Sequence, residues 1–128
     1  MGATNWRRRK LAEPWPTEIR VSKDRRTLTV IFDNGDSHAL PAEYLRVFSP
    51  SAEVQGHSPE QRVTVAGKEA VGIARVEPVG NYAVRIQFDD GHDTGIYSWD
   101  YLYELGTKQD ELWEKYLQAL EWKGLKRD

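Results

Sequence analysis

The sequence predicts an α+β domain in which two hairpin-plus-short-helix units form small antiparallel or mixed β-sheets, followed by a C-terminal helix. Three observations favour this fold class. Segments of β-branched and alternating apolar residues lie between clusters of turn residues, as strands do. Two parts of the chain repeat the same order of strand, turn, strand and short helix. The last part carries apolar residues at helical spacing. Because each unit would have one apolar sheet face, we expect the units to pair these faces or to share one sheet.

The first unit is predicted over residues 17–46. β-Branched residues dominate its second strand, and Asn34-Gly35 is the strongest short-range signal for a hairpin turn. Pro41 suits the first turn of a helix, where its missing N–H is not needed. The predicted elements are, in order, strand 17–21, turn 22–26, strand 27–32, turn 33–36, strand 37–40 and helix 41–46.

The second unit is predicted over residues 73–102. Asp89 and Asp90 are interpreted as turn residues and not as a catalytic carboxylate pair, and Ser98 is a suitable N-cap. The predicted elements are strand 73–76, turn 77–81, strand 82–88, turn 89–91, strand 92–97 and helix 98–102. The FDNG…YL and FDDG…YL segments match with one inserted residue. Two explanations remain open: an internal repeat, or convergence on a common supersecondary pattern.

Three segments lie outside the two units. Residues 1–16 are predicted to be a flexible basic N-terminal tail, which contains the run Arg7-Arg8-Arg9-Lys10. Residues 49–68 connect the units, and connectors of this length are more often functional or mobile than inert. Residues 107–128 are predicted to form a C-terminal helix and tail, with helical spacing over 109–122 and Gly124 as the stop.

Composition limits the classes of protein to which the chain can belong. Its 128 residues fit one domain, and it contains no cysteine. This excludes disulfides and thiolate zinc sites, and it agrees with a reducing compartment, so we expect a cytoplasmic protein. No apolar stretch approaches the roughly 20 residues that span a bilayer, so no membrane partner is expected. The formal net charge of −2 argues against nucleic acid as a partner.

Two segments carry a family resemblance. LPAEYLRVFSPSAEVQGH and GNYAVRIQFDDGHDTGIYSWDYLYEL resemble the gamma-butyrobetaine hydroxylase-like N-terminal domain family. The resemblance covers residues 17–106, which are therefore predicted to be one such domain. Members of this family occur as small stand-alone bacterial proteins of unknown function. They also occur fused to Mrp-type P-loop iron–sulfur scaffold ATPases, and as the N-terminal domain of carnitine-biosynthesis oxygenases.

The resemblance also implies a site that this sequence lacks. In the oxygenases the domain holds a structural zinc through three cysteines of one loop and the histidine of the DGH segment. The histidine is present as His92, but the corresponding loop, residues 46–54, has no cysteine. Serine and alanine cannot replace a soft thiolate ligand. We therefore expect the Cys₃His zinc site to be lost and no cofactor to be bound, with another metal as the alternative. The oxygenase chemistry resides in a separate domain of the fused enzymes, so we expect no enzyme activity.

An alternative metal site would centre on histidine. His92 and His57, with Glu53 or an aspartate from Asp89, Asp90 and Asp93, would give two histidines and one carboxylate. Glu53 and His57 are four residues apart and would share a face if their segment were helical. The prolines and the glycine of that segment argue against a long helix. The other interpretation is that His92 makes a local hydrogen bond beside the hairpin turn.

Among these interpretations, the sequence favours a non-catalytic binding or adaptor domain. The resemblance to the Mrp fusions implies another protein as partner, an iron–sulfur scaffold ATPase or an oxygenase, in iron–sulfur cluster handling or an oxidative pathway. Tyrosine and tryptophan beside arginine are typical interface anchors. The candidate interaction surface comprises Arg46, Ser49, Ser51, Gln55, Trp99 and Tyr101. The competing hypotheses are a small metal-binding protein centred on His92 and His57, and a homodimer whose aromatic surface pairs with itself.

Overall fold

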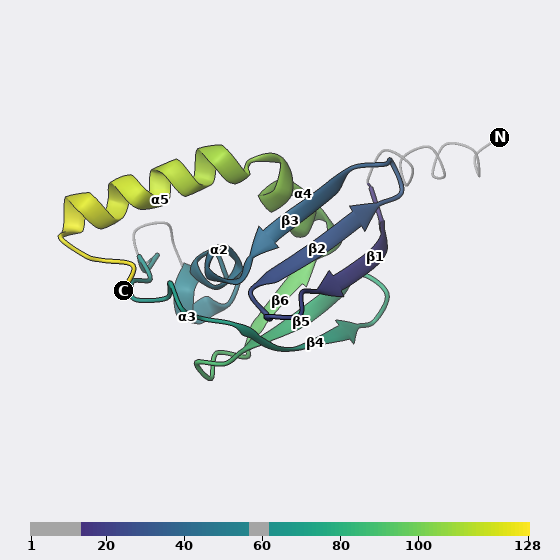
Figure 1. Ribbon diagram of the computed structural model, residues 1–128, viewed down its shortest axis with the longest axis horizontal. Helices are drawn as coiled ribbons and strands as arrows, with labels where there is room; N and C mark the ends of the chain where they lie inside the picture. Colours follow the sequence, from purple (N-terminus) through teal and green to yellow (C-terminus); the bar gives the residue numbers. More distant parts are fainter. Residues whose placement is uncertain (1–13, 57–61) are drawn as a thin grey trace.

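The computed structural model describes residues 14–56 and 62–128, which form two three-stranded antiparallel sheets and several helices (Figure 1). The first sheet has the order β1-β2-β3, and the second has the order β4-β5-β6. The predicted α+β class with two hairpin-plus-short-helix units is therefore confirmed, and the units keep separate sheets. The strands are β1 (Pro16–Val21), β2 (Thr27–Phe32), β3 (Ser37–Pro41), β4 (Ile73–Val79), β5 (Ala83–Phe88) and β6 (Gly95–Ser98).

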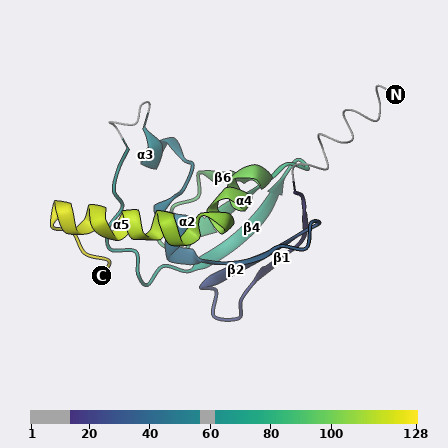
Figure 2. The same cartoon turned by 90° about the horizontal axis from the view of Figure 1, so that it is seen from above.

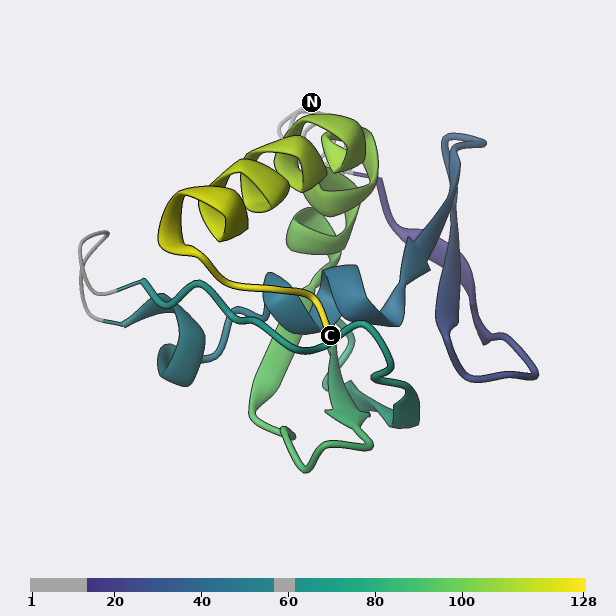
Figure 3. The same cartoon turned by 60° about the vertical axis from the view of Figure 1, so that its left-hand side comes forward.

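Each sheet leads directly into a helix. The helices are α2 (Ala42–Val47), α3 (Ala52–Gln55), α4 (Trp99–Thr107) and α5 (Gln109–Lys123). Figure 2 shows α5 passing over α2, and Figure 3 shows α4 and α5 on one side of α2 with the second sheet on its other side. The predicted stop at Gly124 is confirmed, because this glycine caps α5 in the left-handed conformation. Within the described residues, no helix is long and apolar enough to cross a membrane.

The two units repeat each other in atomic detail. Pro16 pairs with Phe32 as Ile73 pairs with Phe88, and in both units the register shifts two residues later. The Asp33 carboxylate accepts the N–H of Trp15 at 3.1 Å, just before β1. The Asp89 carboxylate accepts the N–H of Gly72 at 3.0 Å, just before β4. The same irregularity and the same turn bonds at equivalent positions favour the internal repeat over convergence.

The strand boundaries of the second unit differ from the prediction. Residues 77–79 belong to β4 and not to a turn, because β4 is an edge strand in which Pro78 needs no ladder hydrogen bond. The returning strand β6 begins at Gly95 and not at His92. The carbonyl of His92 accepts the N–H of Phe88 at 2.9 Å and closes the turn, and the strand pairing resumes only where Ile86 pairs with Gly95.

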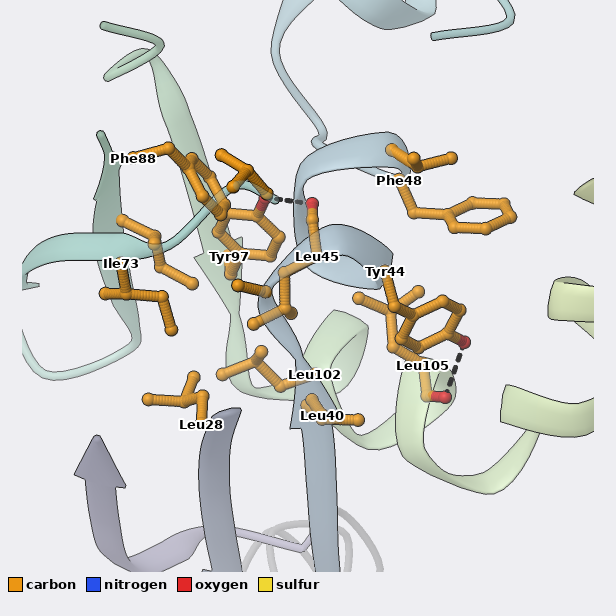
Figure 4. Close-up of a cluster of buried hydrophobic side chains, with 14 of the residues drawn as sticks. Leu28, Leu40, Tyr44, Leu45, Phe48, Ile73, Phe88, Tyr97, Leu102 and Leu105 are labelled. Atoms are coloured by element: carbon orange, nitrogen blue, oxygen red, sulfur yellow. Dashed lines mark hydrogen bonds between the residues drawn. The ribbon is translucent and has the colours of Figure 1, made fainter. Parts of the chain in front are cut away.

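One hydrophobic core serves both units. Leu28 and Leu40 of the first sheet and Ile73 and Phe88 of the second belong to the same buried cluster (Figure 4). Tyr97 is fully buried, and its hydroxyl donates to the carbonyl of Leu45 in α2 at 2.5 Å. Helix α2 therefore joins the two sheets, which makes the two units one domain.

The chain after α5 is fixed to the domain. Gly67 N–H donates to the carbonyl of Lys126, and Glu69 N–H donates to that of Arg127. The Arg127 guanidinium forms two hydrogen bonds, at 2.8 and 2.9 Å, to the carboxylate of Glu43, which is only 7% exposed. It also lies over the ring of Trp113, 5.5 Å from the centroid. The end of the chain thus covers α2, and Figure 3 shows it returning from α5.

Candidate functional site

The candidate site forms where the segment after α2 meets the turn before β6. Ser51 is the N-cap of α3, and its hydroxyl accepts the N–H of Glu53 at 3.2 Å. The same hydroxyl lies 2.6 Å from that of Thr94. Glu53 Oε1 accepts the Thr94 hydroxyl at 3.4 Å. These bonds join residues about forty positions apart in the chain, so the sequence pattern alone does not reveal them.

His92 lies at the centre of this contact. Its Nε2 is 2.8 Å from the Ser49 hydroxyl, and its Nδ1 is 3.3 Å from Glu53 Oε2. A carboxylate only accepts hydrogen bonds, so Nδ1 carries the proton and Nε2 accepts from Ser49. The Ser49 oxygen is then free to accept the N–H of Ser51, which it does at 3.2 Å. We name Ser49, Ser51, Glu53, His92 and Thr94 the serine–histidine cluster.

The charge state of His92 follows from its surroundings. Its side chain is buried, and burial lowers the pKa of His92 below its ordinary value of 6.5. The nearby Arg46 guanidinium lowers this pKa further, and the opposing effect of Glu53 does not restore it. His92 is therefore neutral near pH 7, in agreement with the proton arrangement above.

A partly exposed group of one carboxylate and two cations borders the cluster. Asp90 Oδ2 lies 2.8 Å from Arg46 Nε and 2.6 Å from Lys68 Nζ, and its Oδ1 accepts the N–H of His92 at 3.1 Å. Burial alone would raise the pKa of Asp90, but the hydrogen bonds from Lys68, His92 and Arg46 outweigh it and hold this pKa at about 2. Asp90 is thus both a turn residue, as predicted, and the anchor for two cations.

The order serine, histidine, carboxylate resembles that of a hydrolase triad, but the burial argues against catalysis. Ser49 is 0% exposed, so its hydroxyl has no surface from which to attack a substrate. Gly95 packs directly against it, since a Cβ on Gly95 would lie 2.6 Å from the Ser49 oxygen. The cluster therefore holds the connector after α2 against the second unit by hydrogen bonds.

The predicted metal ligands are only partly brought together. Glu53 and His92 are neighbours, whereas His57 lies outside the described residues. Across residues 14–56 and 62–128, no three His, Cys, Asp or Glu side chains gather closely enough to hold a metal ion. Both ring nitrogens of His92 are occupied by Ser49 and Glu53. A metal at His92 would have to displace one of these bonds, and the site stays a prediction.

An open groove lies beside the cluster, between the segment around Phe48 and helices α4 and α5. It consists of two cavities of about 290 and 390 Å³ that share Phe48, Arg62 and Leu112 in their walls. The Arg62 guanidinium lies over the Phe48 ring, 5.5 Å from its centroid. We name this feature the Phe48 groove. Its other lining residues are Val47, Pro50, Gln55, Val63, Thr64, Tyr101, Glu104, Leu105, Lys115, Tyr116 and Ala119.

The predicted interaction residues divide among three places. Ser49 and Ser51 are buried in the serine–histidine cluster, and Arg46 is largely buried against Asp90. Gln55 and Tyr101 line the Phe48 groove, with the Tyr101 hydroxyl donating to the Phe48 carbonyl at 2.5 Å. Trp99 lines a different cavity. Arg62, Leu112 and Tyr116 were not predicted as groove residues. The apolar spacing of α5 did indicate that Leu112 and Tyr116 face the domain.

Comparison with known proteins gives one family match and several similar solved structures. A family model described as "Gamma-butyrobetaine hydroxylase-like, N-terminal" matches residues 19–103. One solved structure, described as "NMR solution structure of the protein", is 51% identical, with 91% of each chain covered and a TM-score of 0.78. A second with the same description is 48% identical, covers 89% of this chain and 85% of that chain, and has a TM-score of 0.77. No curated protein matches.

A third solved structure links the fold to a family of unknown function. It is a crystal structure of a protein from Acidithiobacillus ferrooxidans, described as a protein with unknown function of the DUF971 family. It is 41% identical to this chain, covers 71% of this chain and 91% of its own, and has a TM-score of 0.60.

Proposed function

Because the chain belongs to the gamma-butyrobetaine hydroxylase-like N-terminal domain family, we propose that it is a non-catalytic protein-binding module. The observation that carries the proposal is the contrast between two neighbouring features. The Ser49, Ser51 and His92 side chains of the serine–histidine cluster are buried and hydrogen-bonded, whereas the Phe48 groove is open and lined by aromatic, aliphatic and basic side chains. Such a mixture is typical of protein interfaces.

The shape and charge of the groove suit a partner segment with apolar and acidic residues. Phe48, Leu112 and Tyr116 offer apolar surface, and Val63 at the rim is 50% exposed. Arg62 and Lys115 supply positive charge beside that surface. An apolar side chain would fill a cavity, and a neighbouring carboxylate would pair with Arg62, which gives orientation as well as affinity.

The serine–histidine cluster supports binding indirectly. Gln55 Nε2 donates to the Ser49 carbonyl at 2.8 Å, so the segment that carries Phe48 and Gln55 is held in place from behind. The opposite wall is fixed by Tyr116, whose hydroxyl donates to the Val65 carbonyl at 2.7 Å. A wall that is rigid before binding loses little conformational entropy on binding, so preorganisation strengthens the interface.

The proposed partner is a P-loop iron–sulfur scaffold ATPase, and the proposed setting is iron–sulfur cluster handling in the cytoplasm. The support is the resemblance of this chain to domains fused to Mrp-type ATPases, since domains fused in one protein are candidates for contact when encoded separately. The lack of cysteine agrees with a reducing compartment. An oxygenase is the other partner class that the family resemblance favours.

The test is a titration of ¹⁵N-labelled protein with the purified scaffold ATPase of the same organism. We expect amide shifts to concentrate at Phe48, Arg62 and Leu112. Arg62→Glu and Lys115→Glu should each weaken binding by about fivefold or more, whereas Lys23→Glu in the β1–β2 turn, an equal change of charge outside the groove, should leave it unchanged. The absence of binding, or an equal effect of all three variants, would refute the proposal.

A metal-binding role is the second candidate, because the structure places Glu53 beside His92. Zinc or iron(II) would bind Nδ1 of the other neutral tautomer of His92, whose proton lies on Nε2 and is donated to Ser49, and would use Glu53 as a second ligand, with His57 as the proposed third. Isothermal titration of each metal into wild-type protein and into His92→Ala tests this. Binding that is identical in both proteins would exclude the site.

A further inference from the structure

A separate cavity lies where the start of β1 meets the β4–β5 turn and the first turn of α4. Its volume is about 240 Å³, and it is lined by Trp15, Tyr82, Ser98, Trp99 and Asp100. It shares no lining residue with the Phe48 groove. Three aromatic side chains and one carboxylate therefore surround a single space, which we name the Trp99 pocket.

The aromatic walls of this pocket are held by hydrogen bonds. The Trp99 indole Nε1 donates to the Asn81 carbonyl at 2.9 Å, and the Trp99 backbone N–H donates to the Tyr82 carbonyl at 3.1 Å. The Trp15 backbone N–H donates to the Asp33 carboxylate, and its carbonyl accepts the Asp33 N–H. Tyr82 is 57% exposed, an unusual degree for a large side chain inside a folded domain. The pocket thus presents the exposed Tyr82 ring beside the hydrogen-bonded indole of Trp99.

Asp100 gives the pocket its charge preference. Its carboxylate is exposed and has no hydrogen-bond or ion-pair partner among the residues that the structure describes. The Ser98 hydroxyl is already used, because it accepts the Tyr101 N–H as the N-cap of α4. The amino end of α4 carries partial positive charge that disfavours a cation, so a cation in the pocket would depend on Asp100.

The internal repeat identifies the equivalent region of the first unit. The Ala42 N–H donates to the Arg26 carbonyl at 2.7 Å as the Trp99 N–H does to that of Tyr82, so these positions correspond. Arg25, in the same turn of the first unit, donates across to the second unit, to the carbonyls of Ile73 and Ala74 at 3.4 and 3.2 Å. The second unit has Asn81 and Tyr82 in its shorter turn and leaves a pocket instead.

We propose that the Trp99 pocket binds an arginine side chain of a partner protein. A guanidinium is planar and weakly hydrated, so it stacks on tryptophan and tyrosine faces while its N–H groups pair with a carboxylate. The aromatic rings of Tyr82 and Trp99 and the Asp100 carboxylate, which has no partner in the described part of the chain, both favour this occupant. The site goes beyond the Phe48 groove, since it gives the domain a second contact point with the opposite charge preference.

The test uses N-acetyl-arginine amide as the probe and the indole N–H resonances of the ¹⁵N-labelled full chain as the readout. We expect saturable shifts of the Trp99 and Trp15 indoles, while those of Trp113 and Trp122 stay in place. N-acetyl-citrulline amide, the uncharged isostere, should not bind. N-acetyl-lysine amide should bind at least about fivefold more weakly than N-acetyl-arginine amide. An ammonium cannot stack on an aromatic ring or form two parallel hydrogen bonds to a carboxylate.

Variants separate this site from the groove. Asp100→Asn and Tyr82→Ala both change exposed side chains and should each weaken arginine binding about fivefold or more. Arg62→Glu in the groove and Trp122→Ala, which removes a tryptophan that is 89% exposed elsewhere, should leave it unchanged. Equal binding of citrulline, shifts confined to other tryptophans, or unchanged affinity in Asp100→Asn would overturn the proposal. None of these results would bear on the groove, so the two proposals fail independently.

Discussion

Tyr44 and Tyr101 make the same contact in opposite directions between the two units. The Tyr44 hydroxyl donates to the Leu105 carbonyl at 2.7 Å, and the Tyr101 hydroxyl donates to the Phe48 carbonyl at 2.5 Å. Each tyrosine lies on the helix that follows its sheet. The accepting residue Leu105 lies four residues after Tyr101, and the accepting residue Phe48 lies four residues after Tyr44. Reciprocal contacts of this kind are the mark of a two-fold relationship. The repeat seen in the strands and turns thus extends to how the units pack.

The reciprocal tyrosines predict matched losses of stability. Tyr44→Phe and Tyr101→Phe each leave a carbonyl without its donor, which should cost about 1–2 kcal/mol of unfolding free energy. We expect the larger loss for Tyr44, because its bond is buried whereas that of Tyr101 is part-buried. Urea denaturation measures both, with the exposed Tyr82→Phe as control. Wild-type stability in both variants would show that the reciprocal bonds do not hold the units together.

The sequence predicted what local patterns encode. Strand alternation, the Asn34-Gly35 turn and the apolar spacing of α5 depend on neighbours in the chain, so they identified the elements and the repeat. Contacts between distant residues carry no such signal: Ser49 and His92 are 43 positions apart, and Glu43 and Arg127 are 84 apart. The serine–histidine cluster and the fixed chain end therefore required coordinates. Pro78 was misassigned to a turn because sequence alone does not show that its strand lies at a sheet edge.

Acid should destabilise the fold through His92. Its pKa is lowered in the folded state, chiefly by burial, so the unfolded state binds a proton more readily. Stability should therefore be unaffected by this group well above pH 6.5, and it should fall as the pH drops from 6.5 through the lower folded-state value. Thermal unfolding from pH 8 to 5 in wild-type protein and His92→Asn is the measurement. An equally steep decline in the variant would assign the effect to other groups.

Gly95 should be required for the close approach of the connector to the second unit. A methyl group there would lie 2.6 Å from the Ser49 oxygen and 3.0 Å from the Tyr97 ring, so Gly95→Ala should cost about 1–3 kcal/mol. Ser49→Gly removes the nearer obstacle, and the double variant should lose less stability than the two single losses combined. Urea denaturation of the four proteins gives this coupling. Simple additivity would mean that Ser49 and Gly95 do not share the contact.

Removing the Arg127 side chain should lower the unfolding free energy. Arg127→Ala leaves the carboxylate of Glu43 buried without its bidentate partner. Breaking a fully buried pair costs about 3–5 kcal/mol, and because the Arg127 side chain is 39% exposed we expect a smaller loss of about 2 kcal/mol.

A second substitution, at Glu43, distinguishes the effect of this ion pair from general fraying of the chain end. Adding Glu43→Gln removes the uncompensated charge, so the Arg127→Ala, Glu43→Gln double variant should regain part of the lost unfolding free energy. The control Lys126→Ala should have little effect on stability, because Lys126 bonds to the Gly67 N–H through its backbone carbonyl. Urea denaturation of the wild-type protein and these variants is the measurement. If Lys126→Ala destabilised the protein as much as Arg127→Ala, the packing of the chain end would matter and the Arg127–Glu43 pair would not.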